Sequence, residues 1–248
     1  MLFVNYSQFL NARLRDGNFS DMTPTEKHVF NHLAQFVSDH KKAFVEKVLN
    51  ERTRYVTVVL ENIYQSQNAS AVIRTCECMG LQDVHIIEDT ARYHLNIRVL
   101  KGSYKWMNME RYRAKHVNNA EMCFNRLRGE GYRILVADPA ADGVSIDELE
   151  VSGGKMALVF GNELQGASAY SLQQADMKIK IPMFGFTESL NVSVSVAICL
   201  NTILRKIRQS GLLIGLSDEE KEIIRLKWFR KIVRRSEVLE REFLRTIL

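Results

Sequence analysis

"IPMFGFTESLNVSVSVAICL", residues 181–200, encloses a polar segment between two apolar ones. The polar middle carries a glycine, a glutamate, a serine and an asparagine directly before a run of valine, alanine, isoleucine, cysteine and leucine. From residue 190 onward the apolar positions fit both the alternation of a strand and one face of a helix. The continuation has basic residues just before Gly211, which is typical of a helix end, so we favour the helix.

Short apolar runs recur along the chain before this stretch and alternate with helical patterns. The helical patterns cover residues 70–80 and 120–131. Near-continuous apolar strands separated by helices are typical of a parallel sheet covered on both faces. The sequence therefore predicts an α/β fold, with strands at residues 55–63, 84–89, 133–139, 155–163 and 177–183.

Both ends of the chain have helical patterns without strands. Thr23, with Pro24 just inside and Glu26 three residues on, forms a capping-box pattern that begins one amphipathic helix or two. In the tail, Ser217 precedes acidic residues in the manner of an N-cap, and the tail reads as one long helix or two. We therefore predict a helical N-terminal extension, a core and a basic helical C-terminal extension, at residues 1–54, 55–211 and 212–248.

Composition narrows the class of protein. The chain of 248 residues has 46% hydrophobic and 25% charged residues, which is ordinary for a soluble globular protein. Four cysteines show no CxxC spacing, and the start lacks a signal peptide, so we expect a reduced, cytoplasmic protein that spans no membrane. His28 and His32 lie one turn apart without further ligands at suitable spacing, so we interpret them as helix-surface residues and expect no metal.

The net charge of +5 matters through its location, because clustered cations attract a polyanion. A cluster occurs in the tail around Trp228 and Phe229. The alternative interpretation is a solvated helix face with Trp228 in the core, and the two are compatible. The basic members are Arg225, Lys227, Arg230, Lys231, Arg234 and Arg235.

Three segments place polar residues directly after predicted strands, at the carboxyl edge where open α/β sheets bind ligands. In the first, Asn68 precedes a helix and Arg74 lies on its second turn, so both could face one anionic ligand at the helix start. Taken alone, this pattern also fits an N-cap asparagine and a solvated arginine. In the second, Gly161 and Gly166 allow a tight loop beside the Glu163 carboxylate, without the spacing of a dinucleotide fingerprint.

The third segment is the opening stretch, and together the three resemble the signature motifs of the SpoU-type RNA 2'-O-ribose methyltransferases of the SPOUT superfamily, which are TrmH-like. The matching residues are Asn68–Thr75, Val159–Gly166 and Ile181–Val194. The resemblance implies a parallel sheet whose C-terminal part forms a deep trefoil knot, an exception to the rule that chains do not knot. It also implies S-adenosylmethionine as cofactor and a homodimer.

The resemblance also implies roles for individual residues. The cofactor pocket would be lined by Ala137, Gly161, Ile181, Met183 and Leu190. The catalytic group would be Asn68, Arg74, Glu163, Ser189 and Asn191. A guanidinium stays protonated, so we expect Arg74 to clamp a substrate phosphate, with Asn68 holding it in place. One departure is Ser70, where many relatives have glycine.

The substrate implied is RNA. Short helical extensions, without a preceding α/β substrate-binding domain, resemble the transfer-RNA branch that methylates a D-loop guanosine. The basic cluster of the tail would then bind tRNA phosphates. Two alternatives stay open: the same reaction on another tRNA position or on rRNA, and a catalytically silent RNA-binding module.

Overall fold

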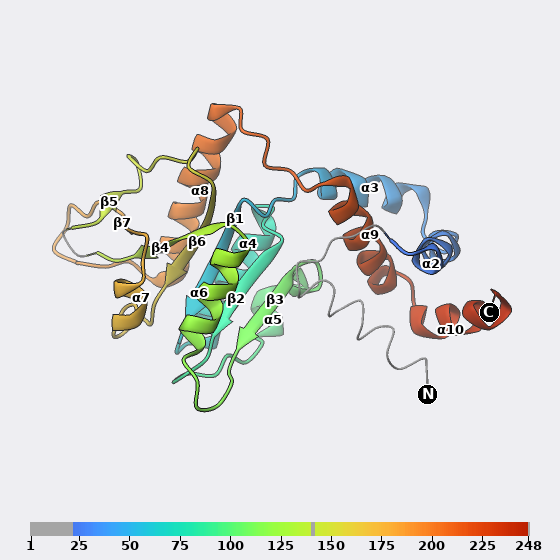
Figure 1. Cartoon of the computed structure of the whole chain (residues 1–248), viewed down its shortest axis with the longest axis horizontal. Coiled ribbons are helices and arrows are strands. Elements are labelled where there is room, and N and C mark those ends of the chain that lie inside the picture. Colours follow the sequence, from blue (N-terminus) through green and yellow to red (C-terminus); the bar gives the residue numbers. More distant parts are fainter. Residues whose placement is uncertain (1–21, 140–141, 248) are drawn as a thin grey trace. The chain divides into compact units, whose positions relative to one another are not determined.

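The computed structural model describes residues 22–139 and 142–247 (Figure 1). The chain divides into two compact units. One is Thr53–Ile214, and the other joins Met1–Arg52 to Gly215–Leu248. The first contains every strand of the described chain, and the second is helical and draws on both ends of the sequence.

A seven-stranded sheet forms the centre of the unit Thr53–Ile214, in the order β3-β2-β1-β6-β4-β7-β5. Every pairing in it is parallel, which confirms the predicted sheet type. The strands β3 and β5 were not predicted, because β3 is polar and β5 has only two residues. The strands are β1 (Val56–Glu61), β2 (Asp83–Ile87), β3 (Asn108–Tyr112), β4 (Tyr132–Ala137), β5 (Val144–Ser145), β6 (Lys155–Phe160) and β7 (Met177–Lys180).

Helices cover both faces of this sheet, as the sequence predicts. Along β1, Val58 faces the cluster that includes α4 (Ser66–Cys78) and α8 (Val192–Ser210). The next residue, Val59, faces the opposite cluster with α6 (Asn119–Gly129), which lies in front of the sheet in Figure 1. Successive strand residues point to opposite faces, so a strand covered on both faces must be apolar throughout. Burying each such side chain contributes roughly 1.5–3 kcal/mol.

The strand order places a ligand site at the carboxyl edge. The chain runs from β1 outward through β2 to β3, then returns to build β4, β6 and β7 on the other side of β1. Loops that leave the carboxyl ends of adjacent strands in opposite directions leave a crevice between them. The crevice here lies where β1 and β6 are neighbours.

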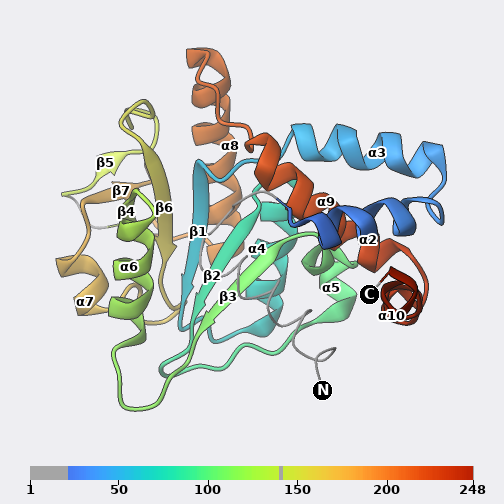
Figure 2. The same cartoon turned by 45° about the vertical axis from the view of Figure 1, so that its right-hand side comes forward.

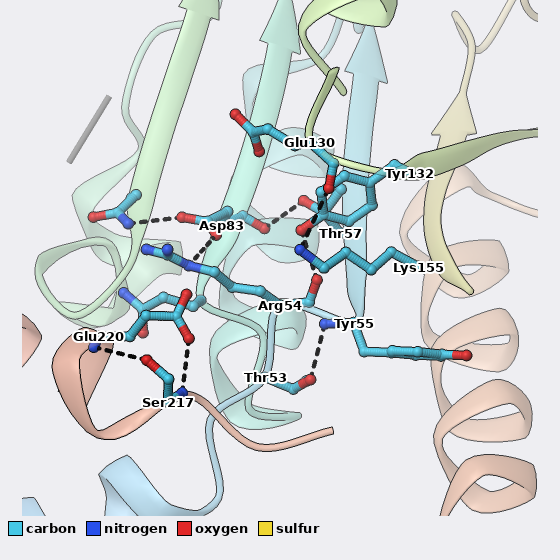
Figure 3. Close-up of polar contacts among 12 residues, drawn as sticks. Thr53, Arg54, Tyr55, Thr57, Asp83, Glu130, Tyr132, Lys155, Ser217 and Glu220 are labelled. Atoms are coloured by element: carbon cyan, nitrogen blue, oxygen red, sulfur yellow. Dashed lines mark hydrogen bonds and ion pairs between the residues drawn. The ribbon is translucent and has the colours of Figure 1, made fainter. Parts of the chain in front are cut away.

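The amino edge of the sheet is closed by polar contacts (Figure 3). Arg54 forms an ion pair with Asp83 (Nε to Oδ2, 2.8 Å), and the Thr57 hydroxyl donates to the Asp83 carbonyl at 2.8 Å. Asn108 donates to the same carboxylate at 2.7 Å, and Tyr132 donates to the Arg54 carbonyl at 2.6 Å. These contacts join β1, β2, β3 and β4 at one end, so the sheet is fixed there and open at the other.

Two helices beside the crevice can be compared with the helix boundaries predicted from the sequence. Helix α8 begins at Val192 with Asn191 as N-cap and ends before Gly211 (φ 73°), so the helical interpretation is correct. Helix α4 begins at Ser66, four residues earlier than predicted, so Asn68 lies inside the helix rather than before it. Its N-cap, Gln65, makes no side-chain capping bond, and this is why no local signal marked the start.

The helical unit contains four described helices: α2 (Pro24–Ala34), α3 (Asp39–Asn50), α9 (Asp218–Ile232) and α10 (Ser236–Ile247). A capping box begins α2 at Thr23, as predicted, and Ser217, predicted as an N-cap, begins α9 with a capping box as well. Trp228 is buried, with the Arg52 guanidinium 5.4 Å from its ring centre, so the indole belongs to the core of this unit. His32 stacks on Phe243, which gives that ring an aromatic neighbour.

Candidate active site

A cavity of about 590 Å³ opens at the carboxyl ends of β4, β6 and β7. This size lies within the range of roughly 300–1,000 Å³ that is usual for ligand pockets. The lining includes every predicted cofactor residue and every predicted catalytic residue except Arg74. These lining residues are Asn68, Ala137, Gly161, Glu163, Ile181, Met183, Ser189, Leu190 and Asn191.

One chain of hydrogen bonds connects the three sequence motifs across this pocket. The Asn68 amide donates to Glu163 Oε1 at 2.9 Å, and its carbonyl oxygen accepts from the Asn191 amide at 3.2 Å. The Asn191 oxygen in turn accepts from the Ser193 backbone N–H at 2.9 Å and from its hydroxyl at 2.6 Å. Each amide has only one orientation that satisfies both neighbours, so the three loops hold one another in a single arrangement.

Glu163 is the fixed end of this chain. Besides the Asn68 amide, its carboxylate accepts the backbone N–H groups of Tyr64 at 3.0 Å and Gln65 at 3.3 Å. Partial burial acts to raise the pKa of Glu163, but the hydrogen bonds from Asn68 and the backbone outweigh it and lower the pKa. Glu163 is therefore a carboxylate that caps the start of α4 and orients Asn68.

The glycines of the second motif serve the loop itself. A Cβ on Gly161 would lie 2.1 Å from the Ala167 nitrogen, and Gly166 has φ 72°. Asn162, which the sequence analysis did not single out, holds the loop by accepting from the Leu164 N–H at 2.8 Å and donating to the Asn62 carbonyl at 2.8 Å. An asparagine directly after a strand was the signal that could have identified it.

The third motif contributes an open backbone. Within the described chain, residues 181–190 make no hydrogen bond through their amide or carbonyl groups. Ile181, Met183 and Leu190 add apolar surface to the pocket wall, and Ser189 is exposed. A ligand with a flat apolar ring and polar edges would find both kinds of surface in this loop.

Residues 55–201 match the SpoU rRNA methylase family. The chain belongs to this family. By this membership it is a methyltransferase, which confirms the resemblance found in the motifs.

Individual relatives and solved structures agree with that assignment. A Borreliella burgdorferi protein named tRNA (guanosine(18)-2'-O)-methyltransferase is 44% identical over 84% of this chain and 93% of its own length. The crystal structure of the A. aeolicus TrmH/SpoU tRNA modifying enzyme superposes with a TM-score of 0.70 at 30% identity, covering 79% of this chain and 98% of that one. The SpoU methyltransferase AviRb from Streptomyces viridochromogenes, in complex with AdoMet, shares the fold at a TM-score of 0.55 and 19% identity, over 66% and 65% of the two chains.

Arg74 lies outside the pocket of this methyltransferase fold. Six residues along an α-helix turn the side chain by roughly 240° and advance it by about 9 Å, so Asn68 and Arg74 occupy different faces of α4. The Arg74 side chain is exposed and makes no hydrogen bond or ion pair with the described residues. The expectation that Asn68 holds Arg74 was wrong, because Asn68 is bonded to Glu163 and Asn191 instead.

The cations in the basic cluster of α9 and its C-terminal end differ in how exposed they are. Arg225 donates to Glu46 at 2.8 Å and Arg230 donates to Glu240 at 2.9 Å, each as a two-pronged ion pair. Lys227 is half-buried, whereas Lys231, Arg234 and Arg235 are exposed. The exposed members are those with the greatest access to a polyanion.

Burial raises the pKa of Cys199, on the pocket wall, to about 12, so its thiol stays neutral. Among residues 22–139 and 142–247, no three histidine, cysteine or acidic side chains are arranged to hold a metal ion. No helix of the described chain is long and apolar enough to cross a membrane.

Proposed function

We propose that this protein transfers a methyl group from S-adenosylmethionine to the ribose 2'-oxygen of a guanosine in tRNA, at the D-loop position 18. The observation that carries the proposal is the hydrogen-bonded chain from Glu163 through Asn68 to Asn191, which joins all three family motifs at one pocket. The names of the relatives from B. burgdorferi and Thermus thermophilus support the tRNA guanosine.

The pocket residues fit the proposed cofactor. An adenosine group needs an apolar wall for its ring and hydrogen-bonding groups at its edges. The Ile181–Leu190 loop offers free backbone N–H and C=O groups, while Ala137 and Ile181 offer the wall. Ala137, Gly161, Ile181, Met183 and Leu190 would hold the cofactor, which supplies an electrophilic methyl group on a sulfonium sulfur.

The protein's own task is alignment. Glu163 fixes Asn68. The amide atoms of Asn68 and Asn191 that can still form hydrogen bonds, and the Ser189 hydroxyl, line the pocket where the ribose hydroxyl must sit. Holding the two reactants in line is worth several kcal/mol of the barrier. Arg74, an exposed cation on another face of the same helix, would bind the phosphate next to the target ribose from outside the pocket.

The surroundings of the pocket support a homodimer. Leu164, Phe184 and Phe186 are at least 83% exposed, and large apolar side chains gathered at one site are typical of an interface. We propose that the dimer forms there, that residues 55–211 are the catalytic core, and that its C-terminal part is knotted. Light scattering should give twice the chain mass.

The helical extensions, residues 1–54 and 212–248, are proposed to bind tRNA in the cytoplasm. Lys231, Arg234 and Arg235 are the exposed cations that support this, since phosphate contacts need accessible positive charge. Arg225, Lys227 and Arg230 belong to the same proposed surface, with Arg225 and Arg230 also held by carboxylates.

The test is incubation with labelled S-adenosylmethionine and either an unmodified tRNA transcript or unmodified rRNA, followed by nucleoside mapping. We expect label in 2'-O-methylguanosine of the D-loop. Label in another nucleoside, or in rRNA alone, would mean that the enzyme modifies a different RNA position. Cofactor binding without methyl transfer to any RNA would mean that the protein is a binding module. A well-folded protein that binds no S-adenosylmethionine would refute the proposal.

A further inference from the structure

The connection from β2 to α5 (Ile97–Leu100) has no regular structure over residues 88–96, yet it is tightly fixed. Glu88, whose side chain is 1% exposed, accepts the Tyr93 N–H at 2.7 Å and the Arg111 Nε at 2.7 Å. Arg111 also donates to the Tyr93 carbonyl at 2.7 Å. The loop between Glu88 and Tyr93 is therefore pinned at both ends by one buried carboxylate and one guanidinium.

Helix α4 supplies the second attachment of this loop. The Ser66 hydroxyl accepts the His94 N–H at 3.2 Å, and the Ser70 hydroxyl accepts the Asn96 N–H at 3.2 Å and bonds the Tyr93 hydroxyl at 2.9 Å. The Ser70 hydroxyl is therefore the group on α4 that holds both ends of the Tyr93–Asn96 segment.

The attachment brings the loop to the face of α4 that carries Arg74. Ser66, Ser70 and Arg74 follow one another at intervals of four residues, which places them on one side of a helix. The short helix α5, which continues the loop, also packs against α4 (Figure 2). Arg74 therefore stands one turn beyond the point where the loop is bonded.

The loop and α5 add further cations to this face. Arg92, Arg98 and Lys101 are exposed and their side chains, like that of Arg74, make no hydrogen bond or ion pair with any residue in 22–139 or 142–247. Neither acidic residue of the loop forms an ion pair with them: Glu88 binds Arg111, and Asp89 accepts the Asn119 amide. These four side chains, which we term the α4–α5 basic surface, carry four positive charges without an ion-pair partner among the described residues.

We propose that the α4–α5 basic surface is a second phosphate-binding surface for the RNA substrate, continuous with Arg74, and that Ser70 and Glu88 hold it in place. The inference rests on the proposed function, because it assigns part of the tRNA contact to Arg92, Arg98 and Lys101. Unpaired cations beside the helix that carries the first motif favour a polyanion over a protein partner.

The test compares two double variants that each remove two positive charges. In R92Q/R98Q, two unpaired cations of the surface are removed. In the control R128Q/K178Q, the cations removed are already paired with Asp176 and Asp142. Thermal unfolding and S-adenosylmethionine binding are measured for both, and binding of unmodified tRNA is measured over a range of salt concentrations.

We expect R92Q/R98Q to raise the Kd and KM for tRNA about tenfold, with kcat at saturating tRNA and cofactor binding unchanged. The slope of log affinity against log salt should fall by about 1 for each phosphate that the variant no longer binds. The control should change Kd less than threefold. Ser70→Ala, which keeps all four cations, should raise KM in the same direction by a smaller factor.

Two results would overturn the inference, and they differ. If wild-type protein methylates tRNA but R92Q/R98Q binds it like the control, the surface has another partner, such as an acidic protein, and the proposed function stands. If wild-type protein neither binds nor methylates tRNA, the proposed function and this inference fail together.

Discussion

Glu88 and Glu163 both follow apolar strands at the carboxyl edge of one sheet, but they are used differently. Glu88 is bonded by the Arg111 guanidinium and the Tyr93 N–H, which neutralises its charge inside the fold. Glu163 is bonded only by amide groups, from Asn68, Tyr64 and Gln65, and keeps an uncompensated charge at the pocket. A paired carboxylate stabilises a fold, whereas an unpaired carboxylate held by dipoles orients a site.

This contrast predicts that variants at the two carboxylates affect different measurements. Substitution of a partner of Glu88 should lower stability and leave the turnover of the folded enzyme intact. Substitution of a partner of Glu163 should lower turnover and leave stability nearly intact. The four experiments below are ordered from the largest expected free-energy change to the smallest.

Arg111→Leu should have the largest effect. It leaves Glu88 buried without its cation, and breaking a buried pair in this way costs about 3 kcal/mol, the lower end of the usual range because the Arg111 side chain is 30% exposed. Urea unfolding measures the loss. Lys178→Leu, which breaks the exposed pair with Asp142, is the control and should cost far less, because solvent screens that pair. Equal losses of stability in the two variants would mean that the buried pair of Glu88 contributes no more than an exposed pair.

Asn68→Ala should lower turnover about 100-fold, equivalent to about 2.7 kcal/mol of barrier, because both neighbours in the hydrogen-bonded chain lose their partner. Stability should fall far less. The control is Asn118→Ala, which removes the N-cap of α6 and should cost about 1 kcal/mol of stability without changing turnover. Methyl transfer under saturating substrates is the measurement. Normal turnover in Asn68→Ala would contradict the proposed alignment.

The pH dependence of stability should separate Glu88 from the other carboxylates. Burial alone would raise the pKa of Glu88, but the hydrogen bond and charge of Arg111 and the Tyr93 N–H lower it. A lowered pKa contributes stability that is present above the unfolded value of about 4.3 and is lost as the pH falls through the folded value. Without Arg111, burial dominates and the pKa of Glu88 rises instead.

The free-energy difference between wild type and Arg111→Leu should therefore shrink as the pH falls from about 6 to about 3. Urea unfolding at several pH values measures it, and Glu163, present in both proteins, cancels. A difference that stays constant with pH would show that Arg111 stabilises the loop by packing alone.

Tyr93→Phe should have the smallest effect, a loss of about 0.5 to 1.5 kcal/mol, because it removes one buried hydrogen bond to Ser70. The Asn96 N–H keeps its bond to Ser70 in this variant and loses it in Ser70→Ala. Hydrogen exchange at Asn96 should therefore be slow in Tyr93→Phe and faster in Ser70→Ala. Equal exchange rates in the two variants would mean that Ser70 does not fix the loop.

Much of the fold was predictable because its signals are local. Capping boxes at Thr23 and Ser217 act over three residues, and four of the six β1 residues are apolar because both faces of the strand are buried. Strand β3 was missed because this edge strand, with sequence NMERY, lacks such a run, and its Asn108 is satisfied by Asp83. Polar edge strands carry no periodicity that distinguishes them from loops.

The candidate site was predictable in its membership but not in its contacts. Asn68, Glu163 and Asn191 reach one pocket, as parallel strands sharing a carboxyl edge require. The start of α4 escaped sequence reasoning because its amides at Tyr64 and Gln65 are bonded by Glu163 rather than by a neighbouring side chain. The twist of the helix between positions 68 and 74 places Arg74 on another face of α4 from Asn68. The sequence did not reveal this, because the predicted helix began four residues too late, after Asn68.

The sequence by itself determined the α/β class, the helix that follows Asn191, and the three loops that carry the family's motifs. These follow from periodicity, capping and glycine conformation, which act over a few residues. Only the tertiary structure decided that Glu163 begins α4, that Ser70 holds the loop after β2, and that Arg74 faces solvent. Those outcomes depend on bonds between residues far apart along the chain, and the register of the parallel sheet decides which of them meet.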